Sequence, residues 1–303
     1  MSTSQTPTSP DTPSISFEFF PPKTLGASAR LWRSVERLAP LDPAFVSVTY
    51  GAGGATRERT MAAIMAIRDR ARLNVAGHLT CVGASRQDVL HAAKIYRKLG
   101  CKRIVALRGD PPNDAVGNPT RFESHPDGFA GAADLVAGLA EMNHFDIWVA
   151  AYPEKHPEAP SLKADIEALK RKIDAGAHGA ITQFFFENEA FYRFRDACAA
   201  AGITAPIVPG ILPIENFKKL CNFAARCQAR IPDWFAKAFQ NAADQGTEDL
   251  LSLAIATEQC HDLVENGVEH LHLYTLNNPD LPYQICQALG VEPSPSRVAV
   301  SCG

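Results

Sequence analysis

The sequence predicts an α/β protein of the (β/α)8 TIM-type barrel class, and three observations support this fold. Segments typical of strands alternate with segments typical of helices about eight times, which indicates a parallel sheet. The alternation fills roughly 250 residues, the usual length of a closed barrel of this class. Most strands are apolar until their last one or two residues, which are polar. The alternative is an open doubly wound sheet, but no G-x-G-x-x-G follows a predicted strand, so the barrel is favoured.

The first predicted strand, Ile15–Pro22 (ISFEFFPP), stops at a double proline, although a loop is the alternative for this segment. Side chains alternate along a strand, so Ser16, Glu18 and Phe20 share one face. If Glu18 points into an apolar cavity, desolvation disfavours its charged form and makes it a proton donor. The alternative is a Glu18 that stands in solvent or in an ion pair.

The later elements follow from the same periodicities. The other strands are predicted at Phe45–Thr49, Asn74–Leu79, Arg103–Leu107, Ile147–Ala151, Gly179–Gln183, Ile207–Gly210 and His270–Leu276. The helices are predicted at Ala27–Leu38, Ala55–Asp69, Ser85–Leu99, Ala130–Met142, Ala164–Ala175, Glu189–Ala200, Ile214–Arg226, Asp233–Ala243, Thr247–Asn266 and Asp280–Leu289. Ser85 and Asp88 have the spacing of a capping box at the start of their helix. Extra helices therefore precede the last strand and follow it at the C-terminus.

A single barrel domain is predicted at 15–290. The segment 1–14 is rich in Ser, Thr and Pro, which is typical of a disordered tail, and 291–303 is expected to be a loose C-terminal tail. Residues 111–128 form the longest predicted loop, and loops of this length inside a domain are usually functional or mobile.

Composition narrows the class of protein. The chain has 303 residues, of which 46% are hydrophobic and 21% charged, with a formal net charge of −3, so nothing indicates a nucleic-acid or membrane-surface partner. No secretory signal and no apolar run of about 18 residues is present. The eight cysteines include no C-x-x-C pair, which favours reduced thiols in a cytoplasmic protein.

Polar and aromatic residues gather where the predicted strands end, which is where active sites of such barrels lie. They are Glu18, Thr49, His78, Asp110, Tyr152, Gln183, Gly210 and Tyr274. Together they indicate a polar cavity at one mouth, although His78 alone is more typical of a hydrogen-bonded interior histidine than of a base. His156, Arg171 and Lys172 form a cationic patch suited to phosphates, with a solvated basic face as the alternative. No metal site is expected, because the spacing of the candidate ligands fits none.

Nine motifs, in order, carry a resemblance to a known family. They are FEFFPP at 17–22, SVTYGAGG at 47–54, GHLTC at 77–81, IVALRGDPP at 104–112, AAYPEKHPEA at 150–159, LKRKIDAGA at 169–177, ITQFFF at 181–186, PGILP at 209–213 and HLYTLN at 272–277. Through them the chain resembles the bacterial methylenetetrahydrofolate reductases from residue 15 to residue 290. The resemblance implies a barrel that holds non-covalent FAD at its carboxyl mouth. It also implies reduction of 5,10-methylenetetrahydrofolate by NADH in a ping-pong reaction of one-carbon metabolism and methionine synthesis, by a homo-oligomer.

The resemblance also assigns roles to residues. Glu18 is implied as the general acid that opens the folate imidazolidine ring to an iminium, and Asp110 as the carboxylate that faces the pterin and the flavin. The implied FAD contacts are Thr49, Tyr50, Ala52, His78, Arg108, Gly109, Asp110, Ala132, Tyr152, His156, Ala159, Asp165, Arg171 and Lys172. The implied substrate contacts are Glu18, Thr49, Asp110, Gln183, Lys219, Phe223 and Asn278.

The chain departs from its relatives at a few of these positions. Lys219 and Asn278 replace a Gln and an Arg that hold folate, so Lys219 is expected to take over part of the missing charge. Ala168 replaces an Asn that contacts FAD in some relatives. The alternative assignment is another barrel flavoenzyme, such as one resembling proline dehydrogenase, but the FEFFPP and ALRGDPP motifs argue against it.

Overall fold

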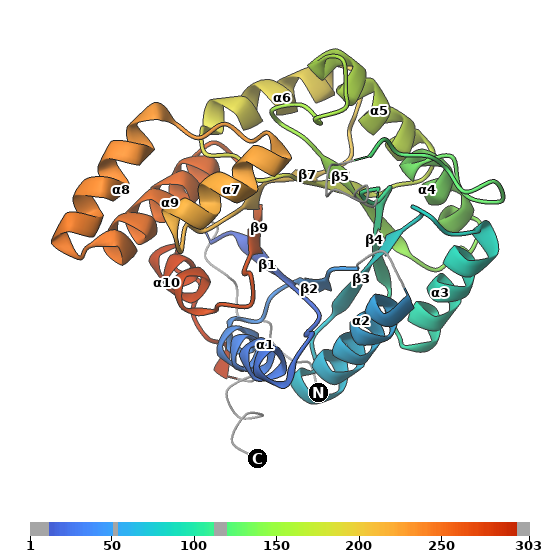
Figure 1. Ribbon diagram of the computed structural model, residues 1–303, viewed down its shortest axis with the longest axis horizontal. Helices are drawn as coiled ribbons and strands as arrows, with labels where there is room; N and C mark the ends of the chain where they lie inside the picture. The colour runs from blue at the N-terminus through green and yellow to red at the C-terminus, as the bar shows by residue number, and fades with distance from the viewer. Residues whose placement is uncertain (1–11, 51–53, 112–119, 296–303) are drawn as a thin grey trace, which may run out of the picture.

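The computed structural model describes residues 12–50, 54–111 and 120–295 of the chain. All strand pairs in these residues are parallel, and they form one sheet in the order β7-β6-β5-β4-β3-β2-β1-β9-β8 (Figure 1). The strands are β1 (Ser14–Phe19), β2 (Phe45–Val48), β3 (Val75–Thr80), β4 (Arg103–Leu107), β5 (Asp146–Ala151), β6 (Gly179–Thr182), β7 (Ile207–Val208), β8 (Gly210–Ile211) and β9 (His270–Tyr274).

The sheet closes because its two end strands, β7 and β8, are consecutive in the chain on either side of Pro209. The sequence predicts one strand here, Ile207–Gly210, whereas the structure divides it in two. β7 pairs with β6 and β8 pairs with β9, while the carbonyl of Pro209 accepts a 3.0 Å bond from the amide of His272. A proline has no amide hydrogen to donate, so it suits the point where the chain changes partners. Counted as one, β7 and β8 complete an eight-stranded barrel, which confirms the predicted fold class.

Helices surround the barrel, as Figure 1 shows. They are α1 (Leu25–Leu38), α2 (Gly54–Ala66), α3 (Arg86–Lys98), α4 (Ala132–Ala140), α5 (Leu162–Asp174), α6 (Asn188–Ala200), α7 (Phe217–Cys227), α8 (Asp233–Gln245), α9 (Glu248–Glu265) and α10 (Asp280–Ala288), with a 3-10 turn at Ala39–Leu41 and a π turn at Ile67–Ala71. Side-chain caps start several of them; the hydroxyl of Ser85 accepts the amide of Asp88, as the capping box predicts. The extra helices expected before and after the last strand are α7, α8, α9 and α10.

The alternation of side chains divides the core into an outer and an inner layer. The outward residues of the strands, such as Phe17 and Phe19, are fully buried against the helices. Inside the barrel, Phe45, Val105 and Trp148 belong to a separate apolar cluster that β2 to β7 contribute. The interior next to β1 and β9 is instead lined by polar side chains, and this half of the barrel holds the candidate site.

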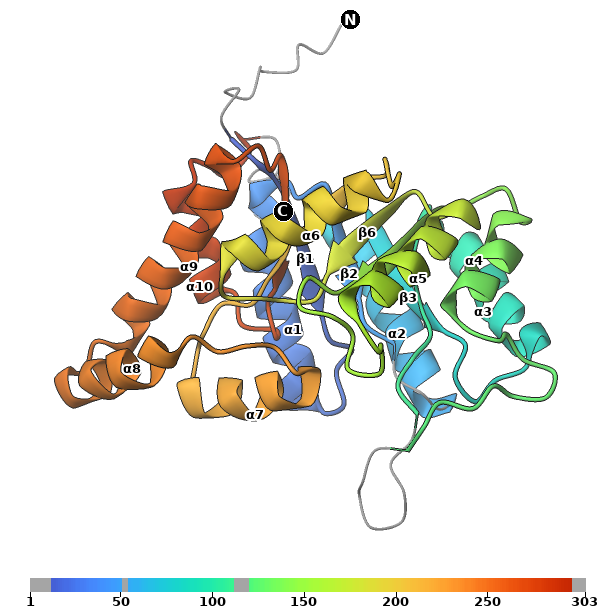
Figure 2. The same cartoon turned by 90° about the horizontal axis from the view of Figure 1, so that it is seen from above.

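The α7–α8 segment has a small apolar core of its own, separate from that of the barrel. Phe184, Leu220, Phe235 and Phe239 are buried in it. Figures 1 and 2 show α8 extending outward from the barrel beside α9, while α7 lies closer to the barrel. This segment therefore adds a wall to the barrel without contributing a strand.

The chain stays packed just past the predicted end of the domain. Val291 is buried, and the amide of Ser294 donates to the carbonyl of Pro40 at 2.7 Å. Most of the two predicted tails, residues 1–11 and 296–303, lies outside the described residues, so the boundaries at 14 and 290 remain predictions. Among the helices that the structure describes, none combines the length and the apolar character needed to cross a membrane.

Candidate active site

Glu18 lies inside the barrel near the carboxyl end of β1, on the face that its strand periodicity predicts. Its side chain is 14% exposed, and its Oε2 lies 3.3 Å from Nε2 of His78 and 3.8 Å from Nε2 of His272. Burial raises the pKa of Glu18, whereas the neighbouring His78 and the nearby Ser47 hydroxyl lower it by smaller amounts. The net upward shift favours the protonated acid, as the sequence predicts.

The two neighbouring histidines are neutral, because burial disfavours their charged forms as well. Desolvation lowers the pKa of His78 despite the nearby Glu18, and it lowers the pKa of His272 to about 3. Neither Nε2 atom makes a well-aligned hydrogen bond, although both lie close to the Glu18 carboxyl. The upward shift for Glu18 and the downward shifts for both histidines favour a neutral cluster over a buried ion pair, which argues against the ion-pair alternative for Glu18.

The loop after β9 holds the end of β1 in place. The hydroxyl of Thr275 donates to the carbonyl of Glu18 at 2.6 Å. The side chain of Asn277 accepts from the amide of Phe20 and donates to its carbonyl, both at 2.9 Å. Leu276 and Asn277 have φ angles of 49° and 59°, in the left-handed region that costs most residues energy. The loop that bears this strain thus fixes the backbone at the carbonyl of Glu18 and two residues beyond it.

Two members of the predicted phosphate patch, His156 in the loop after β5 and Lys172 on α5, lie near each other and near Arg108, which follows β4. The charges of Arg108 and Lys172 both lower the pKa of His156, after a larger effect of burial. Nζ of Lys172 donates to the carbonyl of Ala150 at 2.5 Å, and burial lowers its pKa to about 8. The buried carboxylate of Asp165 accepts a hydrogen bond from the amide of His156 at 2.7 Å. Asp165 therefore holds the loop after β5 in place, in addition to offsetting part of the positive charge of the patch.

Other predicted flavin contacts surround this patch. The ring of Tyr152 meets the ring of His156 edge-on at 4.6 Å, and Asp110 is one of the charges that raise the pKa of Tyr152. Arg108 forms a two-pronged ion pair with Glu158, at 2.5 and 2.9 Å, which the sequence analysis did not anticipate. Arg171 is exposed on α5 beside Lys172.

The remaining predicted flavin contacts lie around the same mouth or outside the described part. Thr49 follows β2, the buried Tyr50 comes next, and Gly109 has a φ of 86° in the loop after β4. Ala159 accepts Nζ of Lys155 at 2.8 Å, and Ala132 is the first residue of α4. Ala52 lies outside the described residues.

The predicted substrate contacts fall into two groups. Gln183 follows β6, and the ring of Phe223 stacks on Phe184 at 5.2 Å while remaining 38% exposed. Lys219 and Asn278 come together around Glu215, whose raised pKa is due first to burial and is then lowered by both neighbours. An exposed aromatic face and a mixed charged cluster thus border the same mouth.

Comparison with known proteins identifies the family. Residues 4–290 match the family described as methylenetetrahydrofolate reductase. The chain belongs to this family. It is 48% identical over 284 residues to the 5,10-methylenetetrahydrofolate reductase of Pectobacterium carotovorum, covering 93% of this chain and 92% of the relative. It is also 48% identical over 280 residues to the 5,10-methylenetetrahydrofolate reductase of Escherichia coli, covering 92% and 91%.

Solved structures share the fold at low sequence identity. A Clostridium thermocellum protein described as binding 5-methyl-5,6,7,8-tetrahydrofolic acid aligns with a TM-score of 0.56 and 17% identity, over 92% of this chain and 95% of the other. A dihydropteroate synthase from Coxiella burnetii, in complex with pteroic acid, aligns with a TM-score of 0.51 and 12% identity, over 94% and 93%. These likenesses support the barrel fold of this methylenetetrahydrofolate reductase family member.

The family is flavin-dependent, and the residues at the barrel mouth fit such a cofactor. Arg108, His156 and Lys172 supply hydrogen-bond donors and positive charge suited to a diphosphate. The hydroxyls of Tyr50 and Ser47 are buried without a hydrogen-bond partner within the described structure. Buried polar atoms usually have partners, so a bound polar group is consistent with this chemistry.

Several residues of the site were missed by the sequence analysis. His272 lies next to Glu18 and is hydrogen-bonded to Ser16, whose role was not predicted although its face was, and Asn277 and Thr275 brace the end of β1. The alternation in HLHLY places both histidines and Tyr274 on one strand face, which is a usable signal. The histidine face of β9 lies beside Glu18 because β1 pairs with β9, and this pairing is seen only in the closed barrel.

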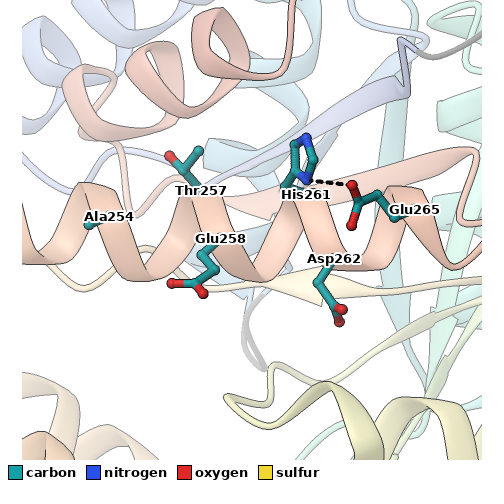
Figure 3. Close-up of a pocket in the computed structure, with 6 residues that line it drawn as sticks. All are labelled: Ala254, Thr257, Glu258, His261, Asp262 and Glu265. Carbon is teal, nitrogen blue, oxygen red and sulfur yellow. Dashed lines mark ion pairs between the residues drawn. The ribbon is translucent and has the colours of Figure 1, made fainter.

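A hollow of about 450 Å³ lies elsewhere, on α9 (Figure 3). Its lining consists of Ala254, Thr257, Glu258, His261, Asp262 and Glu265. His261 and Glu265 form an ion pair at 3.4 Å within the helix, and the lining shares no residue with the barrel mouth. The hollow is therefore separate from the candidate site at the mouth.

Proposed function

We propose that this methylenetetrahydrofolate reductase family member reduces 5,10-methylenetetrahydrofolate to 5-methyltetrahydrofolate with NADH, through FAD bound at the carboxyl mouth of the barrel. The observation that carries the proposal is the buried Glu18, whose pKa is raised among neutral histidines. A carboxyl group must keep its proton near neutral pH to act as a general acid.

The bound flavin supplies hydride chemistry, and the protein supplies the proton and the positions. Glu18 donates its proton to the folate nitrogen that departs as the five-membered ring opens. Arg108, His156 and Lys172 hold the cofactor diphosphate. The exposed ring of Phe223 and the amide of Gln183 contact whichever substrate is bound.

Glu18→Gln separates the two half-reactions. The amide keeps the shape of the side chain but carries no acidic proton, so reduction of the flavin by NADH should persist. Reoxidation by the folate substrate should slow by about 10²- to 10⁴-fold. Anaerobic stopped-flow absorption of the flavin measures each step. Equal loss of both steps would assign Glu18 to folding or cofactor binding instead.

The visible spectrum of the purified protein tests the cofactor and the donor together. We expect a flavin spectrum that bleaches with NADH under anaerobic conditions and recovers with the folate substrate. A colourless protein that takes up no FAD on reconstitution would contradict the proposal. Bleaching of the flavin by proline, with no reoxidation by the folate substrate, would favour the proline-dehydrogenase-like alternative.

Lys219 is proposed to bind the anionic glutamyl tail of folate. It is exposed, and Glu215 and Asn278 are its neighbours in the described structure. Lys219→Ala should raise the folate KM severalfold and leave the NADH half-reaction unchanged, because one exposed ion pair is worth up to about 1 kcal/mol. Lys218→Ala, an exposed lysine one position earlier, is the matched control. An unchanged folate KM in Lys219→Ala would refute the role.

The bacterial relatives lead us to propose a cytoplasmic homo-oligomer. Sedimentation velocity of the purified protein tests the assembly, and a sedimentation coefficient of a monomer at micromolar concentration would contradict it.

A further inference from the structure

Fully buried polar side chains form a line inside the barrel, next to β1 and β9. Ser16 and His272 are both 0% exposed. Barrel interiors of this class are usually filled with branched apolar residues, and the β2 to β7 half of this interior follows that rule. Burying a polar group without a partner costs about 1–3 kcal/mol, so the polar line needs both an internal network and a reason to exist.

The line runs from the amino end of β9 toward Glu18 through two hydrogen bonds and one longer approach, which a small rotation of the His272 ring or the Glu18 carboxyl must close for transfer. His270 Nε2 lies 2.9 Å from the hydroxyl of Ser16, and that hydroxyl lies 2.7 Å from Nδ1 of His272. The opposite ring atom, Nε2 of His272, lies 3.8 Å from Oε2 of Glu18. The parallel register of β1 and β9 stacks the groups in this order.

The outer end of the line reaches the amino end of the barrel. His270 is the first residue of β9 and is only partly buried. The ring of Phe45 packs on both histidines, 5.8 Å from His270 and 5.7 Å from His272. Arg103 lies over the other side of Phe45 and is the charged group that, after burial, lowers the pKa of His272. The Phe45 ring thus packs along the hydrogen-bonded row of His270, Ser16 and His272.

We propose that His270, Ser16 and His272 conduct protons from the amino end of the barrel to Glu18. The inference rests on the proposed function, in which the reaction consumes one proton in each turnover. The carboxyl mouth is where the substrates and the flavin bind, so a route from the opposite end can refill Glu18 while that mouth is occupied.

The transfer conserves protons and uses no other reactant. Water gives a proton to Nδ1 of His270 as the Nε2 proton of that ring passes to the oxygen of Ser16. The hydroxyl proton of Ser16 moves to Nδ1 of His272, and the Nε2 proton of His272 moves to the carboxylate of Glu18. Each histidine stays neutral and changes its tautomer, and rotation of the rings and the hydroxyl restores the starting state.

Ser16→Ala tests the proposed proton path, because it removes the hydroxyl that connects His270 to His272 and leaves the Glu18 side chain unchanged. In a single turnover, prereduced enzyme already holds the Glu18 proton, so the folate step should keep its wild-type rate. In steady state, kcat should fall roughly tenfold or more, with a larger solvent deuterium isotope effect, because refilling becomes limiting. Ser34→Ala removes another fully buried hydroxyl, one that donates to the carbonyl of Arg30 on α1, and should change neither rate.

A readout without turnover comes from nitrogen NMR of the two histidine rings. In the wild type, His270 and His272 should each carry the ring proton on Nε2, as the proton path requires. Ser16→Ala should change the ring nitrogen chemical shifts of both histidines. His270→Gln, at the partly exposed outer end, replaces Ser16→Ala if that variant does not fold, and the same fall in kcat is expected.

Two results would overturn the proposed proton path. One is a Ser16→Ala enzyme with wild-type kcat and isotope effect. The other is a fall in the single-turnover rate as large as the fall in kcat, which would make Ser16 a positioning residue for Glu18. Failure of the proposed function is seen separately, as a wild-type enzyme whose flavin the folate substrate does not reoxidise.

Discussion

Glu18 owes its chemistry to its surroundings, since a carboxyl group of the same type in water would be ionised at neutral pH. The nearest groups that can carry a positive charge, His78 and His272, are themselves desolvated. An arginine at either position would hold the carboxylate charged and remove the acid. The choice of histidine over arginine at these two positions is therefore what keeps Glu18 a proton donor.

The buried histidines also predict how stability depends on pH. The pKa is lowered to about 4 for His270 and to about 3 for His272, so both stay neutral when the unfolded chain, with ordinary values near 6.5, binds protons. Their contribution is complete above pH 6.5 and is lost as the pH falls toward these values, by up to about 1.4 kcal/mol per pH unit for each ring. Glu18 acts in the opposite sense above pH 4.5, because its folded pKa is raised.

Comparison of wild type with His270→Gln cancels the effect of Glu18. Urea unfolding at pH 7.0, 6.0 and 5.0 should show a shallower loss of stability in the variant, by at most one proton. Identical slopes would mean that His270 titrates normally in the folded protein.

At the scale of elements, the loop after β9 does as much for the site as any strand. Asn277 gives Phe20 both partners that a neighbouring strand would otherwise give, at the point where β1 ends. Sequence reasoning located the HLYTLN motif but read no role for its last residues. The reason is physical: a bond that spans 257 positions leaves no periodic trace in either segment.

Asn277→Ala should destabilise the protein by about 2 kcal/mol, since it removes two hydrogen bonds worth about 1 kcal/mol each. It should also slow the folate half-reaction more than the NADH half-reaction, because the loop braces Glu18. Asn143→Ala is the control: Asn143 also has a positive φ of 46°, but its side chain makes only a 3.4 Å contact with Glu141. Equal effects of the two changes in urea unfolding and stopped flow would remove the bracing role.

The order and type of the elements follow from sequence periodicity, but the division of one strand into β7 and β8 does not. The segment 207–210 is apolar and short, so its pattern is that of an ordinary strand. Gly210 is where the geometry becomes tight, because an added Cβ would lie 2.2 Å from the carbonyl oxygen of Thr182. The need for glycine becomes visible only in the closed barrel, where Thr182 on β6 and Tyr274 on β9 both crowd this position.

For the whole molecule, sequence reasoning recovers the barrel and the end at which its polar residues meet. Glu18, His78 and Tyr152 are found because each ends an apolar strand or stands close to its end. Ser16 is placed on the face of Glu18 but given no role, and His272 is not found, because both lie in mid-strand, where apolar packing is the expectation. The distances between side chains on different strands are set when the barrel closes, and no local sequence pattern encodes that closure.

The C-terminal segment beyond α10 offers a test at this scale. Removing residues 291–303 should cost about 2 kcal/mol in urea unfolding, because Val291 is buried and Ser294 bonds to Pro40. Removing only 296–303 keeps both contacts and is the matched control. If the two deletions are equally stable, the predicted domain end at 290 is correct.

The pairing of β1 with β9 also has a consequence for biosynthesis. Ser16 and His272 are separated by 256 positions, so a growing chain carries Ser16 and Glu18 long before His272 is made. Until β9 emerges from the ribosome, β1 has one unpaired edge, a surface prone to association with other chains. A chain released early thus has an exposed edge and no proton supply, which makes it inactive and a ready target for chaperones and proteases.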